Sequence, residues 1–184
     1  MKLGRLVVRT TVGLLFVGHG TQKLFGWFGG GGPEKTGEAF DSMGLRPGRL
    51  NAVVAGGAEA GGGLMLAAGL ATPVATAALS SVQITAIRKV HAPRGIWASE
   101  GGYEYNAVLL AVLFALTEAG PGPPSLDAAL GSERSGIRWA LAELGAGALA
   151  STIAIAVSER GLLEGTGSQE RTRAEPVPAE AAAR

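Results

Sequence analysis

The sequence predicts an all-α protein made of apolar helices that lie in a membrane. Three observations support this fold class. First, 47% of the 184 residues are hydrophobic and 17% are charged, whereas soluble domains carry about a quarter charged residues. Second, the mean hydropathy is +0.27 and apolar segments recur along the chain. Third, many of the 30 glycines fall inside those segments, where small residues let transmembrane helices approach each other closely.

Four apolar segments form the predicted transmembrane bundle, because a helix needs about 20 mainly apolar residues to cross the hydrocarbon core. We predict a fifth, C-terminal transmembrane helix, whose crossing of the membrane the sequence leaves open. A soluble bundle would need polar helix faces, which the most apolar segments lack. Residues 1–160 then form one domain. The core segments are Leu6–Phe25, Leu50–Leu70, Pro73–Ile87 and Tyr105–Thr117, and the fifth is Ile137–Val157.

The segments outside these helices differ in kind. Lys35–Met43 places Phe40 among charged residues, a pattern typical of a short helix at the membrane interface. Residues 165–184 are rich in charge, Pro and Ala without an apolar face, so we predict a disordered tail. Basic residues fall on both sides of the predicted membrane, and their count leaves the orientation open.

Composition excludes several classes of function. The chain has no cysteine, which excludes disulfides, thiol catalysis, Cys-ligated zinc and iron–sulfur clusters. Its net charge of +1 is spread over dispersed residues, so no nucleic-acid surface is expected. His19 and His91 lie on different segments, which argues against a bis-histidine haem, and no metal constellation stands out. We expect His91 to be a solvated loop residue and the chain to bind no cofactor by itself.

Glu59 is the most informative residue, because it lies near the middle of an apolar segment. An ionisable side chain in a span is costly and usually faces a partner inside the bundle. Antiparallel packing of the first two helices brings His19 and Glu59 to depths within one turn, and His19, Gln22 and Lys23 share one helix face. We predict one polar cavity that is lined by His19, Gln22, Lys23, Glu59, Gln83 and Glu104. In the alternative interpretation, Lys23 or His19 neutralises Glu59, and the resulting pair only holds two helices together.

Other unusual residues are expected to have structural roles. Gly57 and Gly61 are predicted to pack helices closely together. Arg9, near a helix end, is expected to extend toward the interface. Glu143 is expected to pair with Arg138 at the start of the last helix.

Several motifs, taken in order, resemble those of the DoxX family of small membrane proteins. The first-helix pattern matches GLLFVGHGTQKLFG, and the second-helix pattern matches EAGGGLMLAAGL. The fourth helix begins in the family's pattern of two glycines, an aromatic residue and a glutamate. These motifs occupy Gly13–Gly26, Glu59–Leu70 and Gly101–Glu104, with weaker matches at Phe40, Gly44, Pro47, Gly120–Gly122 and Ser125–Asp127.

The resemblance implies a four-helix transmembrane core over about residues 5–130, extended by the segment 137–157. It implies a multi-pass protein of the plasma membrane, and His19, Lys23, Glu59 and Glu104 occupy polar positions of the family's pattern. The family takes its name from a small subunit of a terminal quinol oxidase. We therefore expect a non-catalytic accessory or interaction subunit of a membrane redox assembly, quinol oxidase-like or linked to oxidative stress. Its partners would be other redox subunits or a second copy of the chain, and a partner would bring the cofactor.

Two other functions stay open. The chain could bind or carry a quinone, a lipid or a proton in the cavity near His19 and Glu59, although no inverted repeat is visible. It could also be an enzyme that uses the same two residues as an acid–base pair. The enzyme ranks last, because no nucleophile or metal accompanies the pair.

Overall fold

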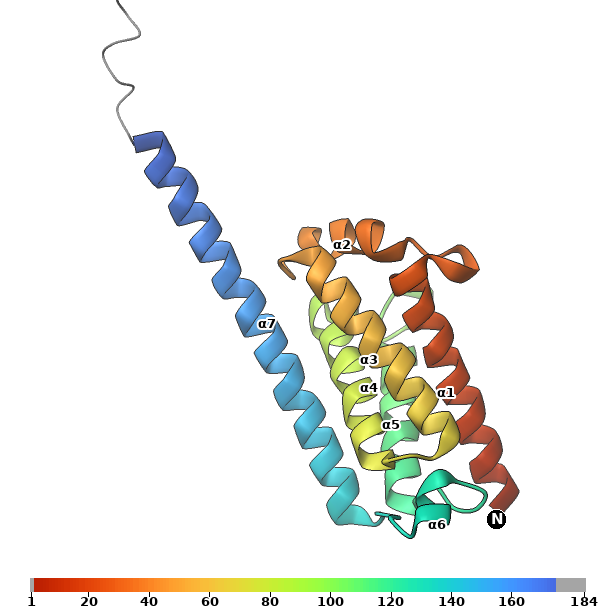
Figure 1. Cartoon of the computed structure of the whole chain (residues 1–184). Helices are drawn as coiled ribbons and strands as arrows, with labels where there is room; N and C mark the ends of the chain where they lie inside the picture. The colour runs from red at the N-terminus through yellow and green to blue at the C-terminus, as the bar shows by residue number, and fades with distance from the viewer. Residues whose placement is uncertain (1, 175–184) are drawn as a thin grey trace, which may run out of the picture.

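The computed structural model describes residues 2–174, which form seven α-helices and no strand, so the predicted all-α class is confirmed. Side chains are described for residues 3–160. Short 3-10 and π-helical turns lie between the longer helices, the π-helical one at Ile87–His91. The helices are α1 (Lys2–Phe25), α2 (Gly32–Ser42), α3 (Gly48–Ala68), α4 (Thr72–Ala86), α5 (Glu104–Ala119), α6 (Leu126–Leu130) and α7 (Ile137–Ala174) (Figure 1).

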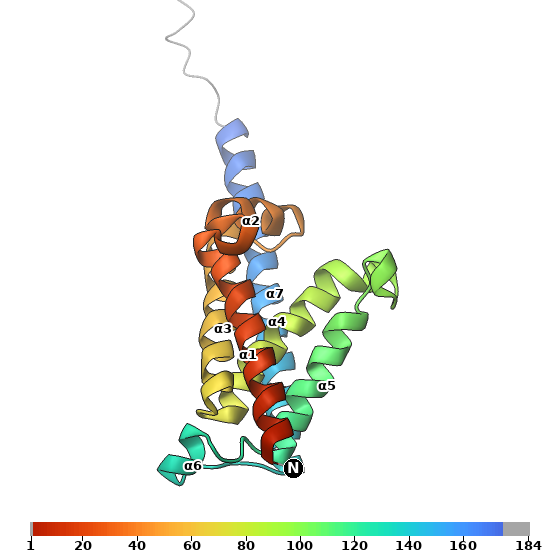
Figure 2. The ribbon, with the colours of Figure 1, turned by 90° about the vertical axis from the view of Figure 1, so that its right-hand side faces the viewer.

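The helices form one bundle that is covered at both ends. α3 packs against α1, α2 and α4, and α4 also contacts α5 and α7. α2 lies across one end of the bundle and α6 at the other, while α7 projects past the α2 end (Figures 1 and 2). The apolar core lies where α1, α3, α4 and α5 meet, and consists of Phe16, Leu66, Ala75, Leu79, Leu109, Leu113 and Leu116.

Each of the five predicted long helices is observed, and α2 overlaps the predicted interfacial segment Lys35–Met43 but begins three residues earlier, at Gly32. Among the described helices, two are long and apolar enough to cross a membrane, namely α3 and the part of α7 over Ile137–Arg160. α4 and α5 have 15 and 16 residues, which is short for a span. The π-helical turn follows α4 directly and lengthens this helical segment to His91.

α7 is longer than the sequence predicts. It continues to Ala174, so residues 165–174 are helical where we predicted the start of a disordered tail. The residues after Arg160 include Leu, Glu, Gln and Arg, which favour a helix, and the first proline comes only at Pro176. The rest of the predicted tail, 175–184, lies outside the described residues.

α1 and α3 meet along a line of small residues, which we call the glycine seam: Gly13 and Gly20 of α1, and Gly56 and Gly63 of α3. A Cβ atom added to Gly13 would lie 2.5 Å from the carbonyl oxygen of Gly63. One added to Gly20 would collide with the backbone of Gly56 and Ala60. The two helices therefore touch backbone to backbone, as small residues in membrane helices allow.

The prediction that Gly57 and Gly61 pack helices together is wrong. Both are exposed, and a Cβ added to either would have open space around it. One residue turns a helix by about 100°, so Gly57 points away from α1 although Gly56 touches it. The neighbouring Gly62 faces Leu79 of α4 instead.

α7 meets α4 through polar side chains, a contact that we call the polar seam: Ser80 with Glu143 and Thr85 with Ser151. Ser80 donates to Glu143 at 3.1 Å, and the hydroxyls of Thr85 and Ser151 are 2.9 Å apart. The other oxygen of Glu143, Oε1, is buried without a partner among the described residues. The predicted pairing of Glu143 with Arg138 is therefore wrong, because Glu143 faces α4 whereas Arg138 is exposed.

The segment between α5 and α7 is tied to the bundle by two charged residues. Arg9 is 2% exposed and donates to the carbonyls of Pro121 and Pro124 at 3.1 and 2.7 Å. It thus points inward and does not extend to the interface as predicted, because this loop folds back over the end of α1. Asp127 accepts hydrogen bonds from the backbone of Ala71 and Thr72 at 2.8 and 3.1 Å.

Asp127 therefore acts as a tether between α6 and the turn that joins α3 to α4. Burial of its carboxylate acts to raise the pKa, but hydrogen bonds from Thr72, Ala71 and Ser132 outweigh burial and lower the pKa below its ordinary value. Ala71 has a left-handed backbone with φ 44°, a conformation that is costly for a residue with a Cβ. The contact with Asp127 holds the turn in this conformation.

Candidate functional site

An ion pair joins the C-terminal end of α1 to the middle of α3. Lys23, in the last turn of α1, donates to Glu59 Oε2 at 2.5 Å. The side chain of Glu59 is 5% exposed and that of Lys23 is 21% exposed. The long lysine stem reaches from the helix end toward the carboxylate, which lies on the buried face of α3. Of the two basic residues that the sequence offered as partners of Glu59, Lys23 and His19, it is Lys23 that makes the contact.

A cavity of about 480 Å³ opens beside this ion pair. Its volume is within the usual range for pockets that bind small molecules. Residues from α1, α2, α3, α4, α5, α7 and the loop before α5 line it. Four of the six residues predicted for a polar cavity are among them: His19, Lys23, Glu59 and Gln83.

His19 and Gln22 have different roles in the structure, although they share a helix face. His19 lines the cavity but is exposed, so it lies where the cavity meets the surface. Its Nδ1 is 3.2 Å from Oε1 of Gln22. Gln22 does not line the cavity and instead donates to the carbonyl of Phe28 at 3.3 Å. It therefore supports the turn after α1, a contact that depends on how the chain leaves this helix.

Gln83 of α4 and Asn106 of α5 form a second polar pair on the cavity wall. Asn106 donates to Gln83 Oε1 at 2.7 Å, and the residues are 7% and 6% exposed. Both line the cavity. A hydrogen-bonded pair of carboxamides offsets the cost of burying each polar group, and it joins two otherwise apolar helices.

Glu104 is the second predicted residue that stays outside the cavity. Its Oε2 accepts a hydrogen bond from the backbone of Ala98 at 2.9 Å, so it braces the loop that precedes α5. His91 lies in the same region and does line the cavity. Its Nδ1 is 2.7 Å from the carbonyl oxygen of Gly101. His91 is thus half-buried, contrary to the prediction of a solvated loop histidine.

The other walls of the cavity are mainly apolar. α2 and the turn after it cover the cavity with Phe40, Met43 and Leu45. α7 adds the small residues Ala150, Ser151 and Ala154. The cavity therefore depends on α7, a helix that the sequence treats as an extension of the core.

The charges of the cavity are largely matched within the protein. Lys23 pairs with Glu59, and Lys89 donates to Glu159 at 3.3 Å. Among the residues that the structure describes, no three His, Asp or Glu side chains gather as ligands for a metal ion. The arrangement can hold a molecule that has an apolar body and a few polar atoms.

Sequence reasoning missed several polar residues of the cavity wall, among them Asn51, His91 and Asn106. Asn106 carried a usable signal, because it is an amide within the most apolar segment of the chain. Asn51 donates to Ser158 of α7 at 3.3 Å, a contact between residues 107 positions apart. No local pattern predicts such a contact.

The structure is a helical bundle with buried polar side chains, and two of the described helices are long and apolar enough to cross a membrane. The DoxX family model matches residues 4–92, from α1 to the π-helical turn after α4. This match over residues 4–92 confirms the resemblance to the DoxX family that is seen in the motifs. The family is membrane-associated, which agrees with the two helices that are long and apolar enough to cross a membrane. No curated protein and no solved structure matches the chain.

Proposed function

We propose that this chain is a multi-pass protein of the plasma membrane that binds a small amphiphilic molecule in the cavity beside Lys23 and Glu59. α1, α3, α4 and α5 would form the transmembrane core and α7 a fifth span. The observation that carries the binding function is the cavity itself, about 480 Å³ in volume with mainly apolar walls and a buried ion pair. Pockets of this size and lining are the usual sites for small molecules.

The distribution of side chains supports the membrane location. Polar residues such as Thr76, Ser80 and Glu143 are buried, whereas large apolar residues are exposed on the outer faces of the helices. Beside the apolar core, so many buried polar residues and exposed large apolar ones are unusual for a soluble protein, and lipid would cover such faces. The exposed apolar residues include Val7, Leu14 and Leu15 of α1, Val53 and Leu64 of α3, and Leu141, Leu149, Ile153 and Val157 of α7.

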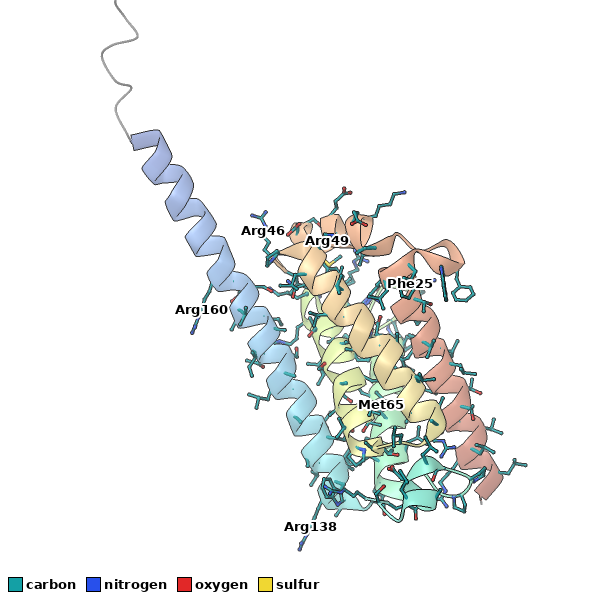
Figure 3. All side chains as sticks on the ribbon, viewed as in Figure 1. Phe25, Arg46, Arg49, Met65, Arg138 and Arg160 are labelled. Carbon is teal, nitrogen blue, oxygen red and sulfur yellow. The ribbon has the colours of Figure 1, made fainter. Side chains whose placement is uncertain are left out.

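The ends of the bundle also carry residues that suit a membrane interface. Arg46 and Arg49 lie at the α2 end and Arg138 at the α6 end, while Phe25 points away from the bundle (Figure 3). Trp27 and Phe28, in the turn after α1, are 56% and 76% exposed. Aromatic rings favour the interface between lipid and water, so these three rings support an α2 end at headgroup level.

Two neighbouring residues of α3 allow a test of the binding function. Ala58 lines the cavity, whereas Gly57 faces outward into open space. Ala58→Phe should fill the cavity, and Gly57→Phe should place the same ring on the outer surface. Native mass spectrometry of the purified protein in detergent would measure binding of decylubiquinone and of 1-monodecanoylglycerol.

We expect wild type and Gly57→Phe to bind at least one of these probes and Ala58→Phe to lose it. The proposal fails if wild type binds neither probe, or if Ala58→Phe binds as wild type does. Circular dichroism and size-exclusion chromatography of both variants would establish that each is folded.

An accessory role in a membrane redox assembly, with quinol oxidase-like or stress-related partners, is the second proposal. The outer face of α7 favours it, because Leu149, Ile153 and Val157 are exposed and a partner helix could cover them as well as lipid does. Replacing Ile153 with Arg should then release a co-purifying partner without affecting probe binding. If nothing co-purifies with wild type in mild detergent, the accessory proposal fails and the binding proposal is unaffected.

A further inference from the structure

The Gln83–Asn106 pair has hydrogen-bonding groups left over. A carboxamide has a carbonyl group that accepts hydrogen bonds and an amino group that donates them. The hydrogen bond of 2.7 Å uses the amino group of Asn106 and the carbonyl group of Gln83. The amino group of Gln83 and the carbonyl of Asn106 take no part in this hydrogen bond. Both side chains line the cavity.

This balance does not depend on how the two amides are oriented. Oxygen and nitrogen of a carboxamide can be exchanged without changing its shape. If both side chains are turned over, Gln83 keeps a free carbonyl and Asn106 a free amino group. In either arrangement the pair offers one free amino group, which donates, and one free carbonyl group, which accepts. A hydroxyl group is the smallest group that satisfies both, because it donates and accepts.

The ionic groups of the cavity favour an uncharged molecule. Lys23 is already paired with Glu59, and Lys89 with Glu159. A charged ligand would bring an unmatched charge into a mainly apolar enclosure or would break one of these pairs, and both are costly. A neutral ligand leaves the pairs in place.

We infer that the cavity binds an uncharged amphiphile through a hydroxyl group held between the free donor and the free acceptor of Gln83 and Asn106. Its apolar part contacts Val54, Val82 and Leu109, which line the same cavity. This inference rests on the proposed binding function and defines the chemical class of the ligand. An ester or ketone without a hydroxyl group binds less well, because it leaves the acceptor of the pair unmatched.

Three probes with the same acyl chain test this class. 1-Monodecanoylglycerol is neutral and has hydroxyl groups, methyl decanoate is neutral without one, and decanoate is charged. Native mass spectrometry or isothermal titration with the full chain in detergent would give their relative affinities. We expect wild type to bind 1-monodecanoylglycerol at least tenfold more tightly than either other probe.

A double variant and a matched control separate the subsite from general packing. Gln83→Leu with Asn106→Leu removes the pair and leaves no single unmatched amide. Thr76 and Thr117 form a buried pair between the same two helices, 2.7 Å apart, and neither lines the cavity. We expect the leucine variant to bind 1-monodecanoylglycerol only as weakly as methyl decanoate, and Thr76→Val with Thr117→Val to bind as wild type does.

The outcomes distinguish the inference from the proposed function. If wild type binds all three probes equally, or the leucine variant keeps the tenfold preference, the hydroxyl subsite is wrong although the cavity binds ligands. If wild type binds no probe, both are wrong. Displacement of 1-monodecanoylglycerol by a decyl-substituted quinol, but not by its quinone, would support the inference with a ring alcohol as the source of the hydroxyl. Failure of the quinol to displace it would support an acyl glycerol.

Discussion

α1 meets α3 through glycines, whereas α7 meets α4 through serine, threonine and glutamate side chains. At the glycine seam, Gly20 lies so close to α3 that an added Cβ would collide with backbone atoms. At the polar seam, Ser80 donates to Glu143 at 3.1 Å, and an oxygen of Glu143 stays unmatched. Lipid provides little hydrophobic drive for helices to associate, so shape and hydrogen bonds must hold them.

The two seams differ in the property that holds the helices together. The glycine seam depends on the absence of side chains and lies wholly within residues 4–92, the part matched by the DoxX family. The polar seam depends on partners and includes α7, which lies outside that part. Interhelical hydrogen bonds in membranes contribute about 0.6 kcal/mol on average, so the glycine seam should be the more sensitive to substitution. Four substitutions follow, from the largest expected effect to the smallest; the first and the third compare the two seams, and the other two test the turn between α3 and α4.

Gly20→Leu should be the most damaging change. The leucine side chain would push α1 away from the backbone of Gly56 and Ala60, and overpacking of this kind costs about 1–3 kcal/mol or more. Unfolding in mixed detergent and SDS micelles would measure the loss. Gly57→Leu, on the outer face of α3, is the matched control and should change stability by less than about 0.5 kcal/mol. Equal effects of the two substitutions would contradict the glycine seam.

Asp127→Asn tests the tether between α6 and the turn that joins α3 to α4. The substitution replaces a carboxylate that accepts bonds from Ala71, Thr72 and Ser132, and we expect a loss of about 1.5–3 kcal/mol at pH 7. Because the pKa of Asp127 is lowered on folding, its contribution to the free energy of unfolding is complete above the unfolded pKa of about 3.9. It is lost as the pH falls through the folded pKa.

The stabilities of wild type and Asp127→Asn should therefore converge in acid and differ at neutral pH. Unfolding at pH 7 and at successively lower pH would follow this convergence. A difference that stays constant over the whole range would show that Asp127 is not the titrating group.

Ser80→Ala probes the polar seam and should cost about 1 kcal/mol, within the range known for such contacts. It leaves both oxygens of Glu143 without a partner at a buried position. Adding Glu143→Leu should recover the loss, because replacing both partners with apolar groups can be nearly neutral. The same unfolding assay would compare the single and double variants. A double variant less stable than the single one would show that Glu143 has a further role.

Ala71→Gly should have the smallest effect and the opposite sign. Ala71 has a φ of 44°, which glycine adopts without the steric cost of a Cβ. We expect a gain of roughly 0.5 kcal/mol after the greater entropy of unfolded glycine is counted. Thermal unfolding in detergent would show it, and Ala111→Gly in the middle of α5 should lower stability instead. A loss in both variants would mean that the turn does not depend on backbone conformation.

Local patterns were sufficient for much of the fold. Runs of apolar residues predicted the five long helices, because helix formation in such runs depends on neighbouring residues. The Lys23–Glu59 contact also followed from the sequence, since a lone carboxylate among apolar residues needs a partner and helical rise sets its depth. The cavity was predicted in part, with Gln22 and Glu104 placed in it although both support nearby loops.

The sequence could not predict how each helix is rotated about its axis or which distant residues come into contact. Gly56 and Gly57 are equivalent in the sequence, yet one touches α1 and the other faces open space. Arg9 looked like an interfacial residue, and only the folding back of the loop at Pro121 and Pro124 shows its partners. Asn106 joins the cavity because α5 turns it toward Gln83.

The sequence by itself determined that this protein is helical, that it is membrane-associated in character, and that Glu59 has a basic neighbour. These properties depend on hydropathy and on spacing within a helix. The tertiary structure decided which glycines touch, that α7 closes the cavity wall, and that two amides face it with a free donor and acceptor. Such features depend on how each helix is rotated against its neighbours, and that rotation is set by the packing of all helices together.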